Sequence, residues 1–218
     1  MTTKVKICGT TNFEDAHCAT EAGADLLGFI FYPKSPRRIE VAAAKAIVST
    51  IRQQTPPSQA SPQMVGVFVN ESLENVLNIM TEIGLDLAQL HGDESQSFLH
   101  EANAALSGRA YKALKANSVE VDAYISTGVP ALLLDANHPN LYGGSGLRAD
   151  ESIASQVAQR CQLLLAGGLT PDNVAAAIRA VQPWGVDVAS GVEAVPGRKD
   201  HQKVQHFVRA VRDINANS

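Results

Sequence analysis

Cys8 stands at the end of a short apolar run and just before a segment that begins a helix. Thr11 followed by Glu14 has the spacing of a capping box, which predicts a helix from about Asn12 to Ala22. Because the unpaired N–H groups at a helix start carry partial positive charge, we expect this helix to favour a Cys8 thiolate. Such a thiolate can act as a nucleophile or a general base. The alternative is that Cys8 is a small buried residue without a chemical role.

Other chemically able residues also follow short apolar runs. They are Arg37 and Arg38 after Tyr32-Pro33-Lys34-Ser35-Pro36, His91-Gly92-Asp93, Asp135, Gly143-Gly144-Ser145-Gly146, Gly167-Gly168 and Ser190-Gly191-Val192. Glycine lets backbone N–H groups come close to an anion, so the three glycine-bearing segments predict a phosphate site. A single Gly-Gly pair is more often only a turn, and the prediction depends on the three segments lying together.

The elements that would bring these residues together alternate along the whole chain. Apolar runs rich in strand-forming residues predict strands at 4–8, 26–31, 64–69, 87–90, 110–113, 131–134, 163–166 and 185–188. Segments with helical periodicity predict helices at 12–22, 41–53, 73–83, 95–106, 119–126, 150–158, 171–181 and 201–215. The last but one is expected to begin at Thr170-Pro171-Asp172, with proline at the first helical position.

This alternation predicts an α/β protein, a single (β/α)8 TIM barrel that spans residues 1–218 as one domain. Runs such as Leu132-Leu133-Leu134 are typical of parallel strands buried on both faces. A doubly wound open sheet is the runner-up, but the GxGxxG fingerprint is absent after the first strand. In a barrel the segments after the strands form the active site, whereas the proline-rich segment 53–63 precedes a strand and is expected to be a connector.

Composition excludes several classes of protein. The net charge is −4 and no basic stripe is present, so a nucleic-acid partner is not expected. The three cysteines lack the spacing of a zinc site and indicate a reducing compartment. The HExxH motif of zinc enzymes is absent, so no metal is expected. No segment looks like a signal peptide or a membrane span, so we expect a cytoplasmic protein without a membrane partner.

Six short motifs occur together in one order along the chain. They are Lys6-Ile7-Cys8-Gly9, Gln89-Leu90-His91-Gly92, Leu133-Leu134-Asp135, Gly143-Gly144-Ser145-Gly146, Gly167-Gly168-Leu169, and Ser190-Gly191-Val192-Glu193 with Pro196-Gly197 and Lys199-Asp200. In this combination the chain resembles the phosphoribosylanthranilate isomerase family of tryptophan biosynthesis from about Lys4 to Val211. The resemblance implies a barrel enzyme without a cofactor that acts on a phosphorylated small molecule, as a monomer or a homodimer.

The implied reaction is the Amadori rearrangement of N-(5-phosphoribosyl)anthranilate to 1-(2-carboxyphenylamino)-1-deoxyribulose 5-phosphate. The resemblance makes Cys8 the general base and Asp135 the general acid, and it assigns Arg37 to the anthranilate carboxylate. A carboxyl at the end of an apolar strand has its ionised form disfavoured, which helps Asp135 to protonate the furanose oxygen. Cys8 would then take the proton from the sugar C2. A guanidinium fork suits a planar carboxylate, and Arg38 could share or take this role.

The remaining implied substrate contacts are His91, Gly144, Gly146, Gly167, Gly168, Ser190 and Gly191. His91 is expected only to bind substrate or to be satisfied by neighbouring backbone, and Asp187 is either near the site or a structural acid. The chain departs from the family after Gly146, where it reads Leu147-Arg148-Ala149-Asp150-Glu151-Ser152 in place of a basic residue and two aromatics. Loss of that aromatic pair puts the closure of the sixth loop over the ligand in question.

Three other functions stay open from the sequence. A related sugar-phosphate isomerase, such as the aminoaldose isomerase of the histidine pathway, uses two aspartates, and Cys8 argues against it. A barrel that binds a phosphorylated ligand without catalysis is suggested only by the missing aromatic pair. A Schiff-base aldolase would use Lys112 or Lys115, but a barrel lysine more often pairs with a neighbouring acid.

Overall fold

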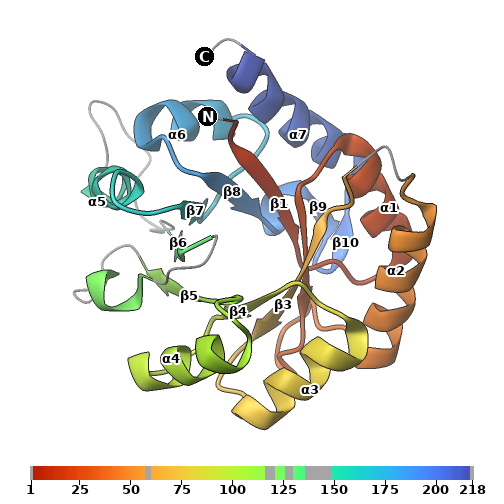
Figure 1. Ribbon diagram of the computed structural model, residues 1–218. Helices are drawn as coiled ribbons and strands as arrows, with labels where there is room; N and C mark the ends of the chain where they lie inside the picture. The colour runs from red at the N-terminus through yellow and green to blue at the C-terminus, as the bar shows by residue number, and fades with distance from the viewer. Residues whose placement is uncertain (1, 57–59, 116–120, 126–129, 136–148, 217–218) are drawn as a thin grey trace.

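Eight parallel strands close into a barrel in the order β1 to β8, and helices surround it (Figure 1). The computed structural model describes residues 2–56, 60–115, 121–125, 130–135 and 149–216. The strands are β1 Lys4–Cys8, β2 Leu26–Ile30, β3 Gln63–Phe68, β4 Leu87–Leu90, β5 Ala110–Lys115, β6 Leu132–Asp135, β7 Leu163–Ala166 and β8 Gly185–Val188. The predicted single (β/α)8 barrel is therefore confirmed, and the open sheet is excluded because β1 pairs with both β2 and β8.

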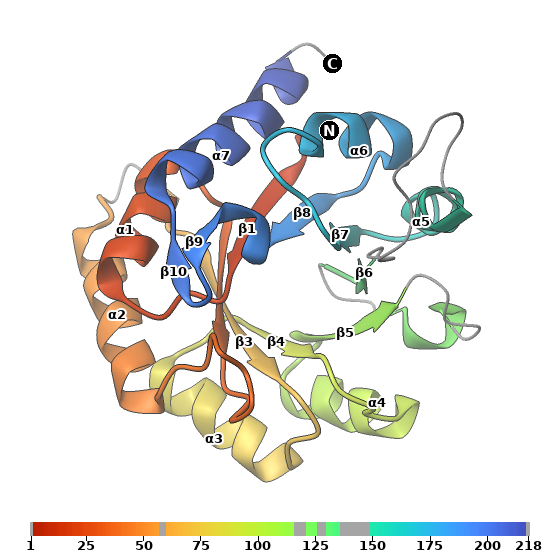
Figure 2. The same ribbon diagram turned by 180° about the vertical axis from the view of Figure 1, so that it is seen from behind.

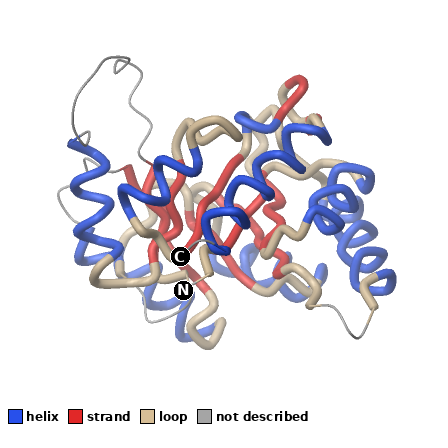
Figure 3. Tube along the Cα trace, turned by 90° about the horizontal axis from the view of Figure 1, so that it is seen from above, coloured by secondary structure: helices blue, strands red, loops and turns tan. Residues whose placement is uncertain are grey.

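The helices follow the strands in the predicted alternation. They are α1 Phe13–Ala22, α2 Val41–Gln54, α3 Leu73–Ile83, α4 Gln96–Ala105, α5 Ala149–Ala158, α6 Val174–Val181 and α7 His201–Ala216, with the 3-10 helices η1 Val121–Tyr124 and η2 Ser190–Val192. Figure 1 shows these helices around the strands, and Figure 3 shows from above that the strands lie in the middle with helices on both sides. No helix in these described ranges is long and apolar enough to cross a membrane.

Alternation of side chains along each strand divides the core into two layers. Leu132 and Leu134 of β6 pack outward, in a cluster with residues of α5 and α6 such as Ala154 and Val181. Leu133, between them, belongs to a cluster inside the barrel, to which strands β2 to β7 contribute. The members of this inner cluster are Leu26, Val65, Leu87, Tyr111, Ala113, Leu133, Leu164 and Ala166. An interior filled with side chains leaves the loops after the strands as the place for a site.

Helix α7 contacts the side of the barrel where β1 begins. The backbone N–H of Thr3 donates to Asn215 Oδ1 at 2.8 Å, and Arg212 Nη2 donates to Asp25 Oδ2 at 2.7 Å. These contacts tie α7 to the residue before β1 and to the residue before β2. Because α7 also packs on both α1 and α6, it completes the ring of helices.

Two predicted helix starts are wrong. Asn12 caps α1 in place of Thr11, because Asn12 Oδ1 accepts from the N–H of Asp15 while the Thr11 hydroxyl donates to the carbonyl of Gly197. The predicted helix from residue 171 begins instead at Val174. Asn173 explains the shorter helix, since its side chain accepts from the Thr170 N–H and donates to the Gly168 carbonyl, which folds 170–173 into a turn.

Two further segments differ from the expectation. Of the helix predicted at 119–126, the described part is the 3-10 helix η1, and residues 119, 120 and 126 lie outside the described residues. The short antiparallel pair β9 Glu193–Val195 and β10 Arg198–Lys199 was not predicted. Figure 2 shows this hairpin beside β1 and α1. The proline-rich connector precedes β3 as expected, with residues 57–59 outside the described part.

Candidate active site

A cavity of about 200 Å³ opens where the barrel strands end. It is lined by Cys8, Ile30, Arg37, Val67, Gln89, His91, Asp135, Ala166, Gly167, Gly168, Leu169, Asp187, Val188, Ala189, Ser190 and Gly191. Eight of the ten residues singled out from the sequence are therefore in one place. The other two, Gly144 and Gly146, lie outside the described residues, as do Gly143, Ser145 and the Leu147-Arg148 that departs from the family.

Cys8 and Asp135 reach this cavity from strands β1 and β6, which two other strands, β7 and β8, separate around the barrel. Cys8 is 5% exposed. Asp135 is the last residue of β6 and is half-buried. A thiol and a carboxyl thus face the same space from different sides of the barrel mouth, as an acid and a base on one substrate require.

The thiol of Cys8 is not in the electrostatic environment that the sequence predicted. Burial raises the pKa of Cys8 above its usual value; the charge of Lys6 lowers it, that of Asp187 raises it, and that of Lys199 lowers it. The prediction that the start of α1 favours the thiolate is wrong in its net direction. Helix α1 begins only at Phe13, five residues after Cys8, and burial dominates at the strand end. Positive charge near Cys8 comes from lysine side chains instead.

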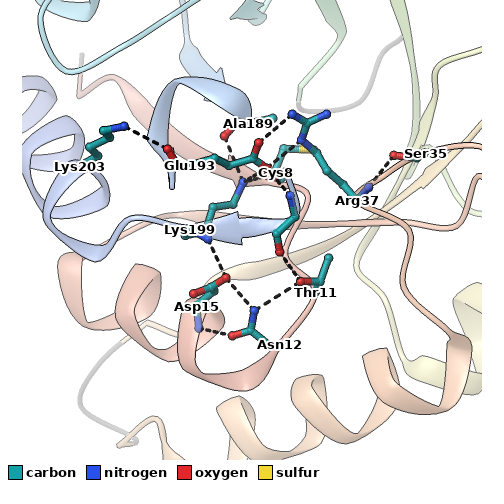
Figure 4. Close-up of polar contacts among 11 residues, drawn as sticks. Cys8, Thr11, Asn12, Asp15, Ser35, Arg37, Ala189, Glu193, Lys199 and Lys203 are labelled. Atoms are coloured by element: carbon teal, nitrogen blue, oxygen red, sulfur yellow. Dashed lines mark hydrogen bonds and ion pairs between the residues drawn. The ribbon is translucent and has the colours of Figure 1, made fainter. Parts of the chain in front are cut away.

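Arg37 is held at the cavity wall by a buried carboxylate. Its Nε and Nη2 donate to Glu193 Oε1 and Oε2 at 2.8 and 2.7 Å (Figure 4). Hydrogen bonds with Glu193 raise the pKa of Arg37, so the guanidinium is a fixed cation. The fork uses only one edge for this pair, and its remaining N–H groups are left for another acceptor. Arg38 pairs with the exposed Glu40 at 2.6 Å and is not among the cavity residues.

Glu193 also connects the hairpin to the end of β1 through Lys199. Lys199 Nζ donates to the carbonyl of Cys8 at 2.6 Å, to that of Ala189 at 3.1 Å and to Glu193 Oε1 at 3.3 Å. Figure 4 shows Lys199 between Cys8 and Glu193, with the Lys199 backbone N–H on Asp15 of α1. Glu193 and Lys199 thus hold the guanidinium of Arg37 and the backbone of Cys8 in fixed positions relative to each other.

A chain of buried polar groups lies on the inner side of the cavity. Lys6 Nζ donates to Gln89 Oε1 at 2.8 Å, and the Tyr111 hydroxyl donates to the same oxygen at 2.9 Å. Gln89 Nε2 is 2.7 Å from His91 Nδ1. Because an ammonium only donates, the Gln89 oxygen must face Lys6, and its amide nitrogen must donate to His91. A neutral His91 then carries its proton on Nε2.

The neutral form of His91 agrees with its surroundings. His91 is exposed at the cavity, yet the protein around the ring removes water from it and, together with the charge of Lys6, lowers its pKa. Asp187 and Asp135 act in the opposite direction. The imidazole is thus a neutral hydrogen-bond donor at the cavity rather than a cation. This is compatible with the binding role expected of it.

The glycine segments after β7 and β8 pack directly against each other. Gly167 and Gly168 have φ angles of 104° and 62°, in the left-handed region that favours glycine. A Cβ on Gly191 would overlap the carbonyl oxygen of Leu169, so the two segments can approach this closely only with glycine there. Ser190 adds a hydroxyl at the same wall of the cavity. Together they form a backbone-lined concavity suited to an anion.

Lys112 is not available as a Schiff-base nucleophile. It is 2% exposed, its Nζ lies 3.0 Å from Glu94 Oε2, and it donates to the carbonyls of Leu90, Gly92 and Ala113. Lys115 is exposed and absent from the cavity residues. Among the residues that the structure describes, no group of three or more His, Cys, Asp or Glu side chains is arranged to hold a metal ion.

Glu193, Lys199, Lys6 and Gln89 are the polar residues of the site to which the sequence gave no role. Lys6 and Gln89 lie two residues before Cys8 and His91, and Asp187 pairs in register with Lys6 on the neighbouring strand β8. This spacing places them on the inward face below the cavity. Polar residues in buried barrel strands were the available signal.

Comparisons with known proteins agree on one family. Residues 5–210 match the family model described as N-(5'phosphoribosyl)anthranilate (PRA) isomerase. The isomerase of Pelobacter propionicus is 44% identical over 216 residues, covering 99% of this chain and 98% of its own. The crystal structure of the Thermotoga maritima phosphoribosyl anthranilate isomerase superposes with a TM-score of 0.79 at 39% identity, covering 97% of this chain and 99% of its own. Another structure under the isomerase name contains reduced 1-(o-carboxyphenylamino)-1-deoxyribulose 5-phosphate; its TM-score is 0.76 at 37% identity, with the same coverage.

Proposed function

The chain belongs to the family of N-(5'-phosphoribosyl)anthranilate isomerases of tryptophan biosynthesis, and we propose that Cys8 is its general base and Asp135 its general acid. One observation carries the proposal: the thiol and the carboxyl line the same cavity, with Arg37 at its wall and the glycine segments beside it. The sequence motifs of the family contribute the thiol, the carboxyl and the glycine segments.

The substrate lies across this cavity with its phosphate on the glycine segments. Backbone N–H groups of Gly167, Gly168 and Gly191, with the Ser190 hydroxyl, bind the phosphate oxygens. The edge of Arg37 that Glu193 does not use binds the anthranilate carboxylate through paired N–H donors. A relative that contains a reduced product, with both a carboxyphenyl group and a phosphate, supports an elongated ligand with two anionic ends.

The reaction needs one proton delivered and one removed. Asp135 protonates the furanose ring oxygen, the C1–O bond breaks, and the nitrogen lone pair forms the C1=N bond of a Schiff base. The Cys8 thiolate then removes the proton from C2, and the electron pair moves to give the enolamine, which becomes the ketose product after tautomerisation. The substrate gains one proton from Asp135 and loses one to Cys8, which leaves a carboxylate and a thiol. The thiol then releases its proton to water and the carboxylate takes one up, so both groups return to their starting forms.

The test is loss of the anthranilyl fluorescence of phosphoribosylanthranilate on addition of the purified chain. Cys8→Ala and Asp135→Asn are each expected to reduce steady-state turnover to a residual rate that only single-turnover reactions detect, while the thermal unfolding midpoint stays near that of the wild type. Cys161→Ala is the matched control, because Cys161 is half-buried beyond α5 and away from the cavity. Near-normal turnover in either site variant would refute the assigned roles. Light scattering on the same samples separates a monomer from the dimeric state named for one Thermotoga maritima relative.

A further inference from the structure

Cys8 as a base requires a nearby positive charge. Burial raises the pKa of its thiol, because a thiolate loses its hydration at a strand end that is 5% exposed. The helix that follows β1 does not reverse this effect. A buried cation close to the thiol would lower the free energy of the thiolate and so lower the pKa of Cys8.

Lys6 is such a cation. It lies two residues before Cys8 on β1, so the two side chains point to the same face of the strand. Lys6 is fully buried, and its Nζ donates to Asp187 Oδ1 at 3.0 Å and to Gln89 Oε1 at 2.8 Å. Cys8, Gln89 and Asp187 line the cavity, whereas Lys6 does not. Its ammonium therefore lies below the cavity floor, where substrate does not touch it.

We propose that Lys6 is a positioning residue for the general base, a permanent buried cation that stabilises the Cys8 thiolate without contacting substrate. The role of Lys6 in catalysis rests on the function proposed for Cys8. The effect of Lys6 on the pKa of the Cys8 thiol is independent of that function, because it depends only on the distance and sign of the two charges. The two statements can thus be tested separately.

The ammonium of Lys6 keeps its charge despite its burial. Burial alone lowers the pKa of Lys6, but the charges of Asp187 and Cys8 outweigh this and the pKa is raised. The groups around Lys6 Nζ are acceptors, as a charged ammonium requires. Gln89 Oε1 accepts from both Lys6 and the Tyr111 hydroxyl, and Asp187 on β8 pairs with Lys6 on β1. Lys6 is held in place by two strands and cannot turn toward water.

Other titratable groups also face the cavity around Cys8. They are Asp187 on β8, Lys199 on β10, Arg37 after β2, the neutral His91 after β4 and Asp135 on β6. Asp187 raises the pKa of Cys8, but its effect is smaller than the lowering by Lys6. Lys199 is paired with Glu193, which weakens its field at the thiol. The buried lysine directly below Cys8 is the dominant cation.

The test is the pH dependence of Cys8 alkylation by iodoacetamide, followed by mass spectrometry of the Cys8 peptide. In Lys6→Met the midpoint is expected to rise by about one pH unit or more, the usual effect of removing an opposite charge within a few ångströms. At a pH below the midpoint this is about a tenfold slower reaction. Cys18 and Cys161 in the same sample are internal references with unchanged midpoints. Lys4→Met is the matched control, because Lys4 lies on the same strand but pairs with Asp25 at the far end.

Two further variants protect the test from a folding defect. Lys6→Met leaves Asp187 buried without its partner, so the double variant Lys6→Met with Asp187→Asn removes both charges. Its midpoint is also expected to rise, by less than in Lys6→Met. Asp187→Asn alone is expected to lower the midpoint. Wild-type midpoints in both Lys6 variants would overturn the proposal.

Turnover gives a second readout that a merely structural role would not produce. Because Lys6 does not reach the cavity, Lys6→Met should lower kcat at neutral pH and move the acidic limb of its pH profile upward, while KM stays near the wild-type value. A rise in KM with an unmoved pH profile would contradict the proposal. If Cys8→Ala keeps its turnover, the function proposed for Cys8 fails, and the alkylation result still stands or falls by itself.

Discussion

Glu193 should contribute more to stability and substrate binding than an exposed glutamate with the same chemistry. Its side chain is 5% exposed and holds the Arg37 fork by two hydrogen bonds of 2.8 and 2.7 Å. Its Oε1 also accepts from Gly197 N–H at 3.2 Å and from Lys199 Nζ at 3.3 Å. In Glu193→Gln the new amide N–H₂ faces Arg37 Nη2, a donor against a donor, and two cations lose their counter-charge.

The expected cost follows from this geometry. Removing one partner of a buried ion pair costs about 3 to 5 kcal/mol. Because the Arg37 side chain is 23% exposed and one oxygen acceptor remains, we expect the lower end, about 3 kcal/mol. For a chain of this size that corresponds to a fall of roughly 6 to 12 °C in Tm. KM should rise, since an Arg37 released from Glu193 would no longer present its free edge to the anthranilate carboxylate that we propose it binds.

Urea unfolding and steady-state kinetics measure the two effects, and Glu40→Gln is the matched control. Glu40 pairs with the neighbouring Arg38 at 2.6 Å, but its side chain is 70% exposed, so its loss should cost at most about 1 kcal/mol. Burial alone would raise the pKa of Glu193, but hydrogen bonds from Arg37 and the charge of Lys199 hold it below its usual value. The stability that Glu193 contributes is present above the pKa of Glu193 in the unfolded chain, and it is lost as pH falls through the pKa of Glu193 in the folded protein. Equal stability and equal KM in the two variants would refute the reasoning.

Two other predictions concern the neighbourhood of Cys8 and the far end of the barrel. In Gly28→Ala the new Cβ would lie 2.8 Å from Cys8 Sγ and 3.2 Å from Cys8 Cα, so the thiol must move. The kcat measured by steady-state kinetics should fall by about 10²-fold, and a wild-type kcat would contradict this. Asp25→Asn should cost about 2 to 3 kcal/mol in urea unfolding at neutral pH, because Asp25 accepts from Arg212, Lys4 and the Val5 N–H. Burial alone would raise the pKa of Asp25, but these bonds lower it. The wild type therefore loses this stability as pH falls below about 4, and the variant loses less. Equal loss of stability in acid for the two proteins would contradict this prediction.

The strands were predictable because burial on both faces leaves long apolar runs, and the rule that barrel sites lie after the strands placed Cys8, Arg37, His91 and Asp135 in one cavity. Helix starts were less predictable where two capping residues compete. Thr11 and Asn12 are adjacent and both cap helices well, and only the contact of the Thr11 hydroxyl with Gly197 decides between them. That contact joins residues 186 positions apart.

The electrostatics of the site could not be predicted from neighbours along the chain. A capped helix after β1 suggested a thiolate, but burial at the strand end has the larger effect on Cys8. The opposing charges come from Lys6, whose partner Asp187 is 181 residues away, and from Lys199, 191 residues away. The β9 and β10 hairpin, which carries Glu193 and Lys199, is too short for a periodic pattern. Charge at this site is therefore a property of the closed barrel.

The central claim is that Cys8 removes the C2 proton and Asp135 opens the ring. The most direct measurement is the kinetic isotope effect for phosphoribosylanthranilate carrying deuterium at C2, in single-turnover reactions of Cys8→Ser and Asp135→Asn. We predict a full primary isotope effect on the residual rate of Cys8→Ser, where proton removal is slowest, and an effect close to unity for Asp135→Asn, where ring opening is slowest. The reverse assignment of the two isotope effects would contradict the account.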